Sequence, residues 1–329
     1  NAETFKHYTE TLHTYEKLFR LKPALYVCDL HPDYLSSQEA CRAAAEDKLP
    51  LLKVQHHWAH MASCMADNTL DCQCFGIIWD GTGLGTDGNI WGGEFLTGSL
   101  DSFDRTGSIR PILLPGGDRA VTEIGRIALS LMQDAKVTDH TLIPLPEQKC
   151  EMLTRLLAVG HSPSASSIGR LFDGVCALLL GRGEVDYEGE GAALTEALSP
   201  FETPEEAGPD TVRFLKGLSY PLSFYEEGSL RIFDTRPVIT GIAEDIRRRT
   251  DRGRTALRFM ATLTCMALEQ CTVLNPKRLP VVLSGGVFQN RFLLHGVVCL
   301  LEDAGFTVYT HHRVSANDEG VSLGQLAVA

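Results

Sequence analysis

Two histidines four residues apart, His56 and His60, have the spacing that most directly suggests chemistry in this sequence. They follow a short strand-like stretch at residues 51–54. If the segment is helical, both imidazoles project from one face about one turn apart, which allows them to bind a single metal ion. Histidines at this spacing also occur on protein surfaces or as satisfied core residues, so the pair alone leaves both interpretations open.

Two carboxylates strengthen the metal interpretation. Asp80 follows an apolar strand and Asp318 lies where a loop meets a helix, and ligand sites often form at such ends of a sheet. A set of two histidines and a carboxylate with open positions is typical of iron or zinc. His57 and Trp58 would face elsewhere on the helix, so we interpret them as packing or supporting residues. We expect the catalytic and metal-binding residues to be His56, His60, Asp318 and Asp80.

Two glycine-rich segments, residues 80–85 and 284–287, each follow an apolar strand. Glycine lets backbone N–H groups approach phosphate or ribose oxygens closely. Neither segment is followed by the Gly-Lys-Ser/Thr of a phosphate-binding P-loop. Tight turns between sheet elements remain an alternative for each one alone, but two such segments suit a nucleotide cleft between two lobes.

Other polar positions could complete such a cleft. Ser166 and Ser167 open a predicted helix, where a hydroxyl could bind ribose or simply cap the helix, and capping is the simpler interpretation. Gly189 could admit a ligand at a turn into another helix, and Asn290 could reach the cleft with its amide. No Gly-x-Ser-x-Gly motif supports serine-hydrolase chemistry.

The elements that must position these residues alternate between strands and helices, which favours an α/β architecture. Strands are expected at residues 25–30, 51–54, 75–79, 90–100, 279–283 and 307–310. Helices are expected at residues 36–46, 56–66, 118–134, 147–158, 166–180, 255–274, 291–304 and from 319 onward, and residues 199–210 are expected to be an exposed loop.

Composition excludes several classes of protein. The chain has 329 residues, of which 44% are hydrophobic, and its net charge of -12 argues against a nucleic-acid partner. The arginines at residues 247–254 form the one dense basic run, which we interpret as a solvated helix end. The ten cysteines show no Cys-x-x-Cys pair, which indicates buried free thiols. With no apolar run near membrane-spanning length, we expect a cytoplasmic protein with no membrane partner.

Taken together, these segments resemble the carboxy-terminal region of the HypF carbamoyltransferases of nickel–iron hydrogenase maturation. The resemblance rests on residues 29–36, 55–60, 79–95, 169–173, 284–290 and 317–320. It runs from about residue 23 to the end of the chain. The related tRNA threonylcarbamoyl-transferase subunit has a Ser-Gly-Gly loop where this chain has Trp79 to Gly83.

The resemblance implies a two-lobed actin-like ATPase (ASKHA) fold with nucleotide and metal in the cleft. It implies a divalent metal, iron or zinc, on His56, His60 and Asp318, with Asp80 as a further ligand. We expect residues 1–140 to form the first lobe, 141–312 the second, and 313–329 a helix that returns to the first. The residues implied to bind ATP or the AMP moiety of carbamoyl-adenylate are Asp80, Gly81, Thr82, Gly83, Ser166, Gly169, Asp173, Gly189, Ser284, Gly285, Gly286 and Asn290.

The implied reaction transfers a carbamoyl group from carbamoyl-adenylate to the C-terminal cysteine of a HypE-type partner. In that reaction none of the chain's own cysteines is the nucleophile. The adenylate would come from a YrdC-like domain of the same full-length protein. That domain and the first strands of the amino-terminal lobe have no counterpart in this sequence, so we expect a fragment. The alternatives are a noncatalytic docking module and tRNA threonylcarbamoyl transfer, and the net charge of -12 disfavours the second.

Overall fold

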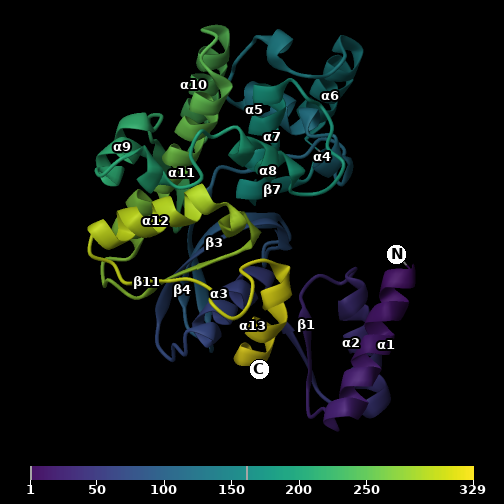
Figure 1. Cartoon of the computed structure of the whole chain (residues 1–329). Coiled ribbons are helices and arrows are strands. Elements are labelled where there is room, and N and C mark those ends of the chain that lie inside the picture. The colour runs from purple at the N-terminus through teal and green to yellow at the C-terminus, as the bar shows by residue number, and fades with distance from the viewer. Residues whose placement is uncertain (1, 161) are drawn as a thin grey trace.

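Strand β3 (Cys74–Leu84) holds the main sheet together, because it pairs with strands that lie far apart in the sequence. The computed structural model describes residues 2–160 and 162–329. In it, β3 runs parallel to β10 (Val281–Ser284) and antiparallel to β4 (Ile90–Gly98) (Figure 1). Within the described residues the sheet has nine strands, whose main path is β11, β10, β3, β4, β5, β9, β8, while β7 pairs with β4 and β6 with β7.

The remaining strands of this sheet are β5 (Phe103–Ile109), β6 (Ile112–Leu113), β7 (Ser164–Ser167), β8 (Phe224–Glu227), β9 (Leu230–Phe233) and β11 (Val308–Tyr309). The helices that follow β5 are α4 (Arg119–Thr122), α5 (Gly125–Asp134), α6 (Glu147–Val159), α7 (Ile168–Leu180), α8 (Glu190–Ala197), α9 (Thr211–Leu218), α10 (Arg236–Arg247), α11 (Arg252–Leu274) and α12 (Arg291–Asp303). Short 3-10 turns are η1 (His140–Leu142), η2 (Pro204–Ala207), η3 (Gly286–Gln289) and η4 (Asp318–Gly320).

The continuous apolar run of β3 is explained by burial on both faces of the sheet. Successive side chains of a strand point to opposite faces. Phe75, Ile77 and Trp79 join the large core that includes residues of α7, α11 and α12, whereas Ile78 packs with Met61 of the preceding helix. Helices therefore cover both faces of the first part of β3, whereas Gly81, Thr82 and Leu84 near its end are only partly buried.

A second, two-stranded sheet carries the amino-terminal part of the chain. Here β1 (Tyr26–Asp29) pairs in parallel with β2 (Leu51–Val54), and Asp29 lies opposite Val54. Helices α1 (Ala2–Phe19) and α2 (Leu35–Asp47) lie beside β1 in Figure 1. The register brings Asp29 next to the residue from which the histidine helix continues.

The histidine helix, α3 (His56–Asp67), packs closely against the last helix, α13 (Val321–Val328). The Ser63 hydroxyl donates a hydrogen bond of 2.7 Å to the Gly320 carbonyl. A Cβ atom on Gly324 would lie 1.8 Å from the carbonyl oxygen of Ala59, so only glycine fits there. This contact holds the carboxy-terminal helix against α3.

Most of the expected elements are confirmed, although α1, α9, α10 and strands β5 to β9 were not among them. Three further differences concern segments that were predicted. The glycine segment after Trp79 is not a turn, because β3 continues through it with a bulge and pairs again with β4 at Gly83. The predicted helix at residues 118–134 is broken into α4 and α5. The predicted loop at residues 199–210 contains η2, where Pro204 is buried. Ser167 caps α7, as expected, and Gly181 ends this helix in the left-handed conformation.

Three composition-based expectations can be compared with the structure. The arginines of residues 247–254 are exposed between α10 and α11, as expected. The ten cysteines are free and most are buried. Among the described residues, none of the helices is long and apolar enough to cross a membrane.

The sheet crosses the boundary that we expected at residue 140. Strands β3 and β4 precede that position, yet they pair with β10 and β7, which follow it. Hydrogen bonding therefore gives no reason to divide the sheet there, and the two-lobed division stays a prediction.

Replacement of Gly324 by alanine is predicted to lower the free energy of unfolding by about 1 to 3 kcal/mol or more, because α13 must move away from α3. Gly217→Ala in α9 is the matched control, since a Cβ atom there meets nothing within 4 Å. Denaturant unfolding measures both. Equal stabilities of the two variants would contradict the packing described here.

Candidate metal centre and nucleotide cleft

Four side chains converge at the start of α3. The donor atoms of His56, His60, Asp80 and Asp318, named the His–Asp cluster below, all lie within 4.8 Å of one another. Nε2 of His56 lies 3.2 Å from Asp80 Oδ2, and Nε2 of His60 lies 3.3 Å from Asp318 Oδ1. Ligand atoms about 2.1 Å from an ion at tetrahedral angles are roughly 3.4 Å apart, so these separations suit one ion.

The chemistry of the donor set also fits a divalent metal. Nε2 of His60 is buried and has no hydrogen-bond partner among the described residues, although it faces both carboxylates. Two imidazole nitrogens and two carboxylate oxygens form a set that iron and zinc both accept. Three of the four residues are buried, whereas the Asp318 side chain is 72% exposed, so the cluster is reached from the Asp318 side.

Helix α3 starts at His56 because Gln55 caps it. The Gln55 Oε1 atom accepts a hydrogen bond from the Trp58 backbone N–H, and its Nε2 donates to the Leu84 carbonyl at the end of β3. One side chain therefore sets both the first turn of α3 and its distance from β3. The same contact keeps the His56 ring next to the bulge that carries Asp80.

Asp80 joins the cluster to the second glycine segment. Its Oδ2 atom faces the two histidines, and its Oδ1 atom accepts a hydrogen bond of 3.1 Å from the Gly286 backbone N–H. The side chain is nearly buried at 9% exposure, so these contacts replace water. The carboxylate thus links β3, α3 and η3 at one point.

Asp29 contacts the cluster, although the sequence analysis did not name it as a site residue. Its Oδ2 atom lies 2.8 Å from Nδ1 of His56, and its Oδ1 atom accepts from the His31 backbone N–H. A carboxylate only accepts, so Nδ1 carries the hydrogen and Nε2 is left to face the cluster. The usable signal was that Asp29 ends β1, the parallel neighbour of the strand that leads into His56.

Charge compensation shifts the pKa values of the cluster. Burial alone would lower the pKa of His56, but Asp29, Asp318 and Asp80 outweigh it and raise that pKa well above its ordinary value. Burial alone would raise the pKa of Asp80, yet His56 and His60 hold it well below its usual range. Protons on the imidazoles therefore balance the carboxylates here, and a cation would take their place.

His57 lies outside the cluster, as expected. Its side chain is fully buried beside Trp91, and its Nδ1 lies 3.1 Å from Nε2 of Gln55. Burial and the neighbouring His56 charge lower its pKa well below the ordinary value, which keeps the ring neutral. The Trp58 ring packs on Phe103, so both residues support α3.

A cavity of about 660 Å³, named the cleft below, adjoins the cluster and shares Asp80 and Asp318 with it. The predicted nucleotide-binding residues that line the cleft are Asp80, Gly81, Thr82, Gly169, Gly189, Gly286 and Asn290. Asn290 also caps α12, because its Oδ1 accepts from the Leu293 backbone N–H. The other predicted residues, Gly83, Ser166, Asp173, Ser284 and Gly285, are not among the residues that line the cleft.

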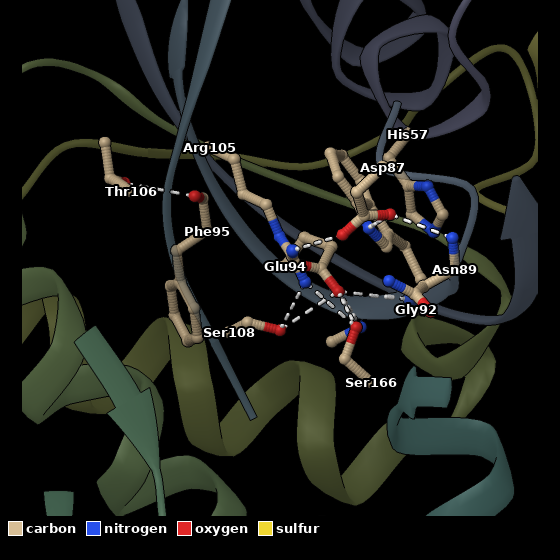
Figure 2. A network of polar contacts seen from close by, with 12 residues as sticks. His57, Asp87, Asn89, Gly92, Glu94, Phe95, Arg105, Thr106, Ser108 and Ser166 are labelled. Carbon is tan, nitrogen blue, oxygen red and sulfur yellow. Dashed lines mark hydrogen bonds and ion pairs between the residues drawn. The ribbon is translucent and has the colours of Figure 1, made fainter. Parts of the chain in front are cut away.

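Ser166 faces a buried polar network instead of the cleft. Its hydroxyl donates a hydrogen bond of 2.6 Å to Oε1 of the fully buried Glu94, and it accepts one from Arg105 (Figure 2). Arg105 also binds Glu94 Oε2 at 2.6 Å and stacks on the Trp91 ring. Ser166 thus stabilises the β4–β7 junction from inside the protein.

The side chains or Cβ positions of the other four residues lie against protein atoms and not along the cleft. A Cβ atom on Gly83 would lie 2.6 Å from carbons of the His56 and His57 rings, and one on Gly285 would lie 2.1 Å from the Trp79 carbonyl oxygen. The Ser284 hydroxyl lies 2.8 Å from Nε2 of His311. Asp173 is buried beside Arg170, and neither of its carboxylate oxygens has a hydrogen-bond partner among the described residues.

Replacement of Asp29 by asparagine is predicted to weaken metal binding about 10- to 100-fold, because the negative charge beside His56 is lost and one amide oxygen must then serve both His56 and the His31 backbone N–H. Asp33→Asn, in the exposed loop that follows, is the matched control. Titration of iron(II) and zinc(II) into each variant measures the effect. Equal affinities for the two variants would show that Asp29 does not orient His56.

Replacement of Asp173 by asparagine is predicted to change how stability depends on pH. Burial raises the pKa of Asp173 to about 7, and the nearby Arg170 reverses this only in part. An ionisable group with a raised pKa in the folded state destabilises the fold as pH rises from about 4 to about 7, here by on the order of 4 kcal/mol. The asparagine variant should lose this slope in denaturant unfolding, whereas Asp186→Asn at an exposed site should keep it.

Comparison with known proteins identifies the family to which this chain is related. Two family models match, "HypF Kae1-like domain" over residues 1–67 and "Carbamoyltransferase, Kae1-like Domain, second subdomain" over residues 76–325. Carbamoyltransferase HypF2 of Cupriavidus necator is 33% identical over 348 residues, which cover 100% of this chain and 42% of that protein. The carbamoyltransferase HypF homolog of the same organism is 31% identical over 316 residues, 92% of this chain and 76% of that protein.

A solved structure is similar along the whole chain. The crystal structure of full-length HypF in the phosphate- and nucleotide-bound form matches with a TM-score of 0.89 and 34% identity, over 100% of this chain and 42% of that one. The chain therefore spans less than half the length of that HypF. By the family models and these relatives, this chain belongs to the HypF carbamoyltransferase family.

Proposed function

We propose that this chain carries the carbamoyl-transfer site of a longer enzyme of nickel–iron hydrogenase maturation. The donor is carbamoyl-adenylate and the acceptor is the C-terminal cysteine thiol of a HypE-type partner. Membership of a family of named carbamoyltransferases supports the reaction class. The nucleotide-bound state of a similar full-length HypF supports an adenylate ligand.

The observation that carries this proposal is that the cleft and the His–Asp cluster share two residues. Asp80 and Asp318 belong to both. A ligand bound along the cleft through its nucleotide part would therefore place its other end beside the cluster. Acyl transfer from an adenylate requires this arrangement, because the carbonyl is attached to the nucleotide phosphate.

The two-lobed actin-like fold is part of the proposal. The Kae1-like family descriptions support it, as does a cleft lined by β3, α7, α8 and η3. We also propose that a YrdC-like domain of the longer protein supplies the adenylate in the cytoplasm. The greater length of the relatives leaves room for such a domain, since the chain spans 42% of the first of them.

His56, His60, Asp80 and Asp318 would hold a divalent iron or zinc ion. When bound, the ion would supply Lewis-acid stabilisation of the charge that develops on the carbamoyl oxygen. Asp29 fixes the ring of His56, and Gly286 fixes the Asp80 carboxylate through its N–H. These contacts set the site before the ligand arrives, so little reorganisation is needed during the reaction.

The residues that line the cleft have a separate task, which is to orient the adenylate. Gly81 and Gly286 let the ligand approach the backbone closely beside Asp80, and Gly189 starts α8 without a side chain. The acceptor thiolate forms the new C–S bond, the bond between the carbamoyl carbon and the phosphate oxygen breaks, and AMP leaves with that electron pair. None of the chain's own cysteines lines the cleft.

Replacement of both His56 and His60 by alanine tests this proposal. We expect metal binding to weaken more than about 100-fold and carbamoylation of a peptide with a C-terminal cysteine to be lost, because half of the donor set is removed. His295→Ala in α12, a half-exposed histidine, is the control. The assays are metal analysis of the purified protein and mass spectrometry of the peptide after addition of carbamoyl-adenylate.

Each contrary outcome supports a different function. Unchanged metal content and unchanged peptide carbamoylation would refute the site. A partner affinity that is the same with and without the two histidines, and with and without nucleotide, would indicate a docking module. RNA binding that weakens with added salt would support tRNA threonylcarbamoyl transfer.

A further inference from the structure

The cleft has a charge balance that does not suit an anionic nucleotide unless a cation takes part. The charged residues that line it are Asp80, Glu188, Glu196, Asp318, Glu319 and Arg170. Arg170 is the one arginine or lysine among those that line the cleft in the described structure. A phosphate group placed among five carboxylates is repelled, and an ion at the His–Asp cluster would offset only part of that charge.

The guanidinium of Arg170 is buried and incompletely paired. The side chain is 1% exposed, and its Nε and Nη1 atoms have no hydrogen-bond partner among the described residues. Its hydrogen bond runs from Nη2 to Oε1 of Glu188 at 3.1 Å. Buried donors without partners are costly, so a native protein retains them where a ligand supplies the acceptors.

Arg170 has two possible neutralising neighbours, and neither holds it firmly. Asp173 lies 3.2 Å from Nε, but without hydrogen-bond geometry, and burial raises its pKa to about 7. Glu188 makes the hydrogen bond, yet its side chain is 53% exposed on the loop before α8. The Glu188 carboxylate can therefore turn towards solvent and release Arg170.

The position of Arg170 on its helix is also informative. It is the third residue of α7, and its backbone N–H donates to the Ser167 cap. A cation in the first turn is disfavoured by the helix dipole, whereas an anion is favoured there. Its Nη2 lies 3.6 Å from the position that a Cβ atom of Gly81 would take, and Gly81 directly follows Asp80. An anion bound to Arg170 would lie close to the His–Asp cluster.

We infer that Arg170 binds the phosphate of the nucleotide in the cleft, and that Glu188 holds the guanidinium until that phosphate replaces it. The guanidinium fork matches a phosphate group, and the Nη2 atom that now donates to Glu188 would donate to the phosphate instead. The inference rests on the proposed function, because it assumes that an adenylate occupies the cleft. It adds a residue that positions the acyl phosphate next to the metal ligands.

The test compares AMP with adenosine, which lacks the phosphate. The 329-residue chain is titrated with each in a calorimeter, as wild type and as Arg170→Gln. We expect the substitution to weaken AMP binding about 10- to 100-fold and to change adenosine binding less than about twofold. Arg182→Gln is the matched control, since that arginine pairs with Glu190 and does not line the cleft.

Glu188→Gln is a second variant at an exposed position, where misfolding is not expected. Removing the competing carboxylate should strengthen AMP binding about threefold or more and leave adenosine binding unchanged. Equal losses for AMP and adenosine in Arg170→Gln, or no gain for AMP in Glu188→Gln, would overturn the inference and leave the proposed function standing. Binding of neither ligand by the wild type would overturn both.

Discussion

The Asp80 carboxylate is the contact on which the rest of the site depends. One of its oxygens faces His56 and His60, and the other accepts a hydrogen bond from Gly286. A nearly buried carboxylate requires partners for both oxygens. Because those partners lie on α3 and on η3, the two segments cannot shift relative to β3 without leaving buried charge unpaired. Burial of this one group therefore fixes the neighbouring elements α3 and β3 against η3, which lies far along the chain.

The same requirement explains why the cluster suits a metal ion. Two carboxylates and two imidazoles lie together with the Asp29 carboxylate behind His56, so positive charge is needed to offset the three carboxylates. In the free protein, protons on the two histidines supply this positive charge. The neighbouring carboxylates favour the protonated rings, so the pKa values of His56 and His60 are raised despite burial. A divalent ion can supply the same charge, and it needs the histidines unprotonated. Binding of the ion is therefore coupled to release of protons from the two histidines.

Local spacing predicted much of the fold and the centre of the site, and long-range pairing accounts for what it missed. The four-residue spacing of His56 and His60 predicted that both rings lie on one helix face. The apolar run of β3 predicted a buried strand. Asp29 was missed because its proximity to His56 comes from the parallel register of β1 and β2. The resemblance implied that Ser166 lies in the cleft, but a hydroxyl at this junction can face either way, and here the buried Glu94 binds it. Spacing along the chain carries no information on that choice.

The glycine segments also show that spacing along the chain does not reveal which residues contact a ligand and which contact the protein. Their positions in the sequence correctly marked the neighbourhood of the cleft, but several glycines are required by protein contacts. Gly83 lies against the histidine rings, and Gly285 adopts a left-handed backbone conformation against the Trp79 carbonyl. A side chain at either position would displace His56 or β10 and so disturb Asp80 before any ligand bound. Close packing at these glycines therefore helps to bring the residues of the His–Asp cluster together, and Gly81 and Gly286 line the cleft beside it.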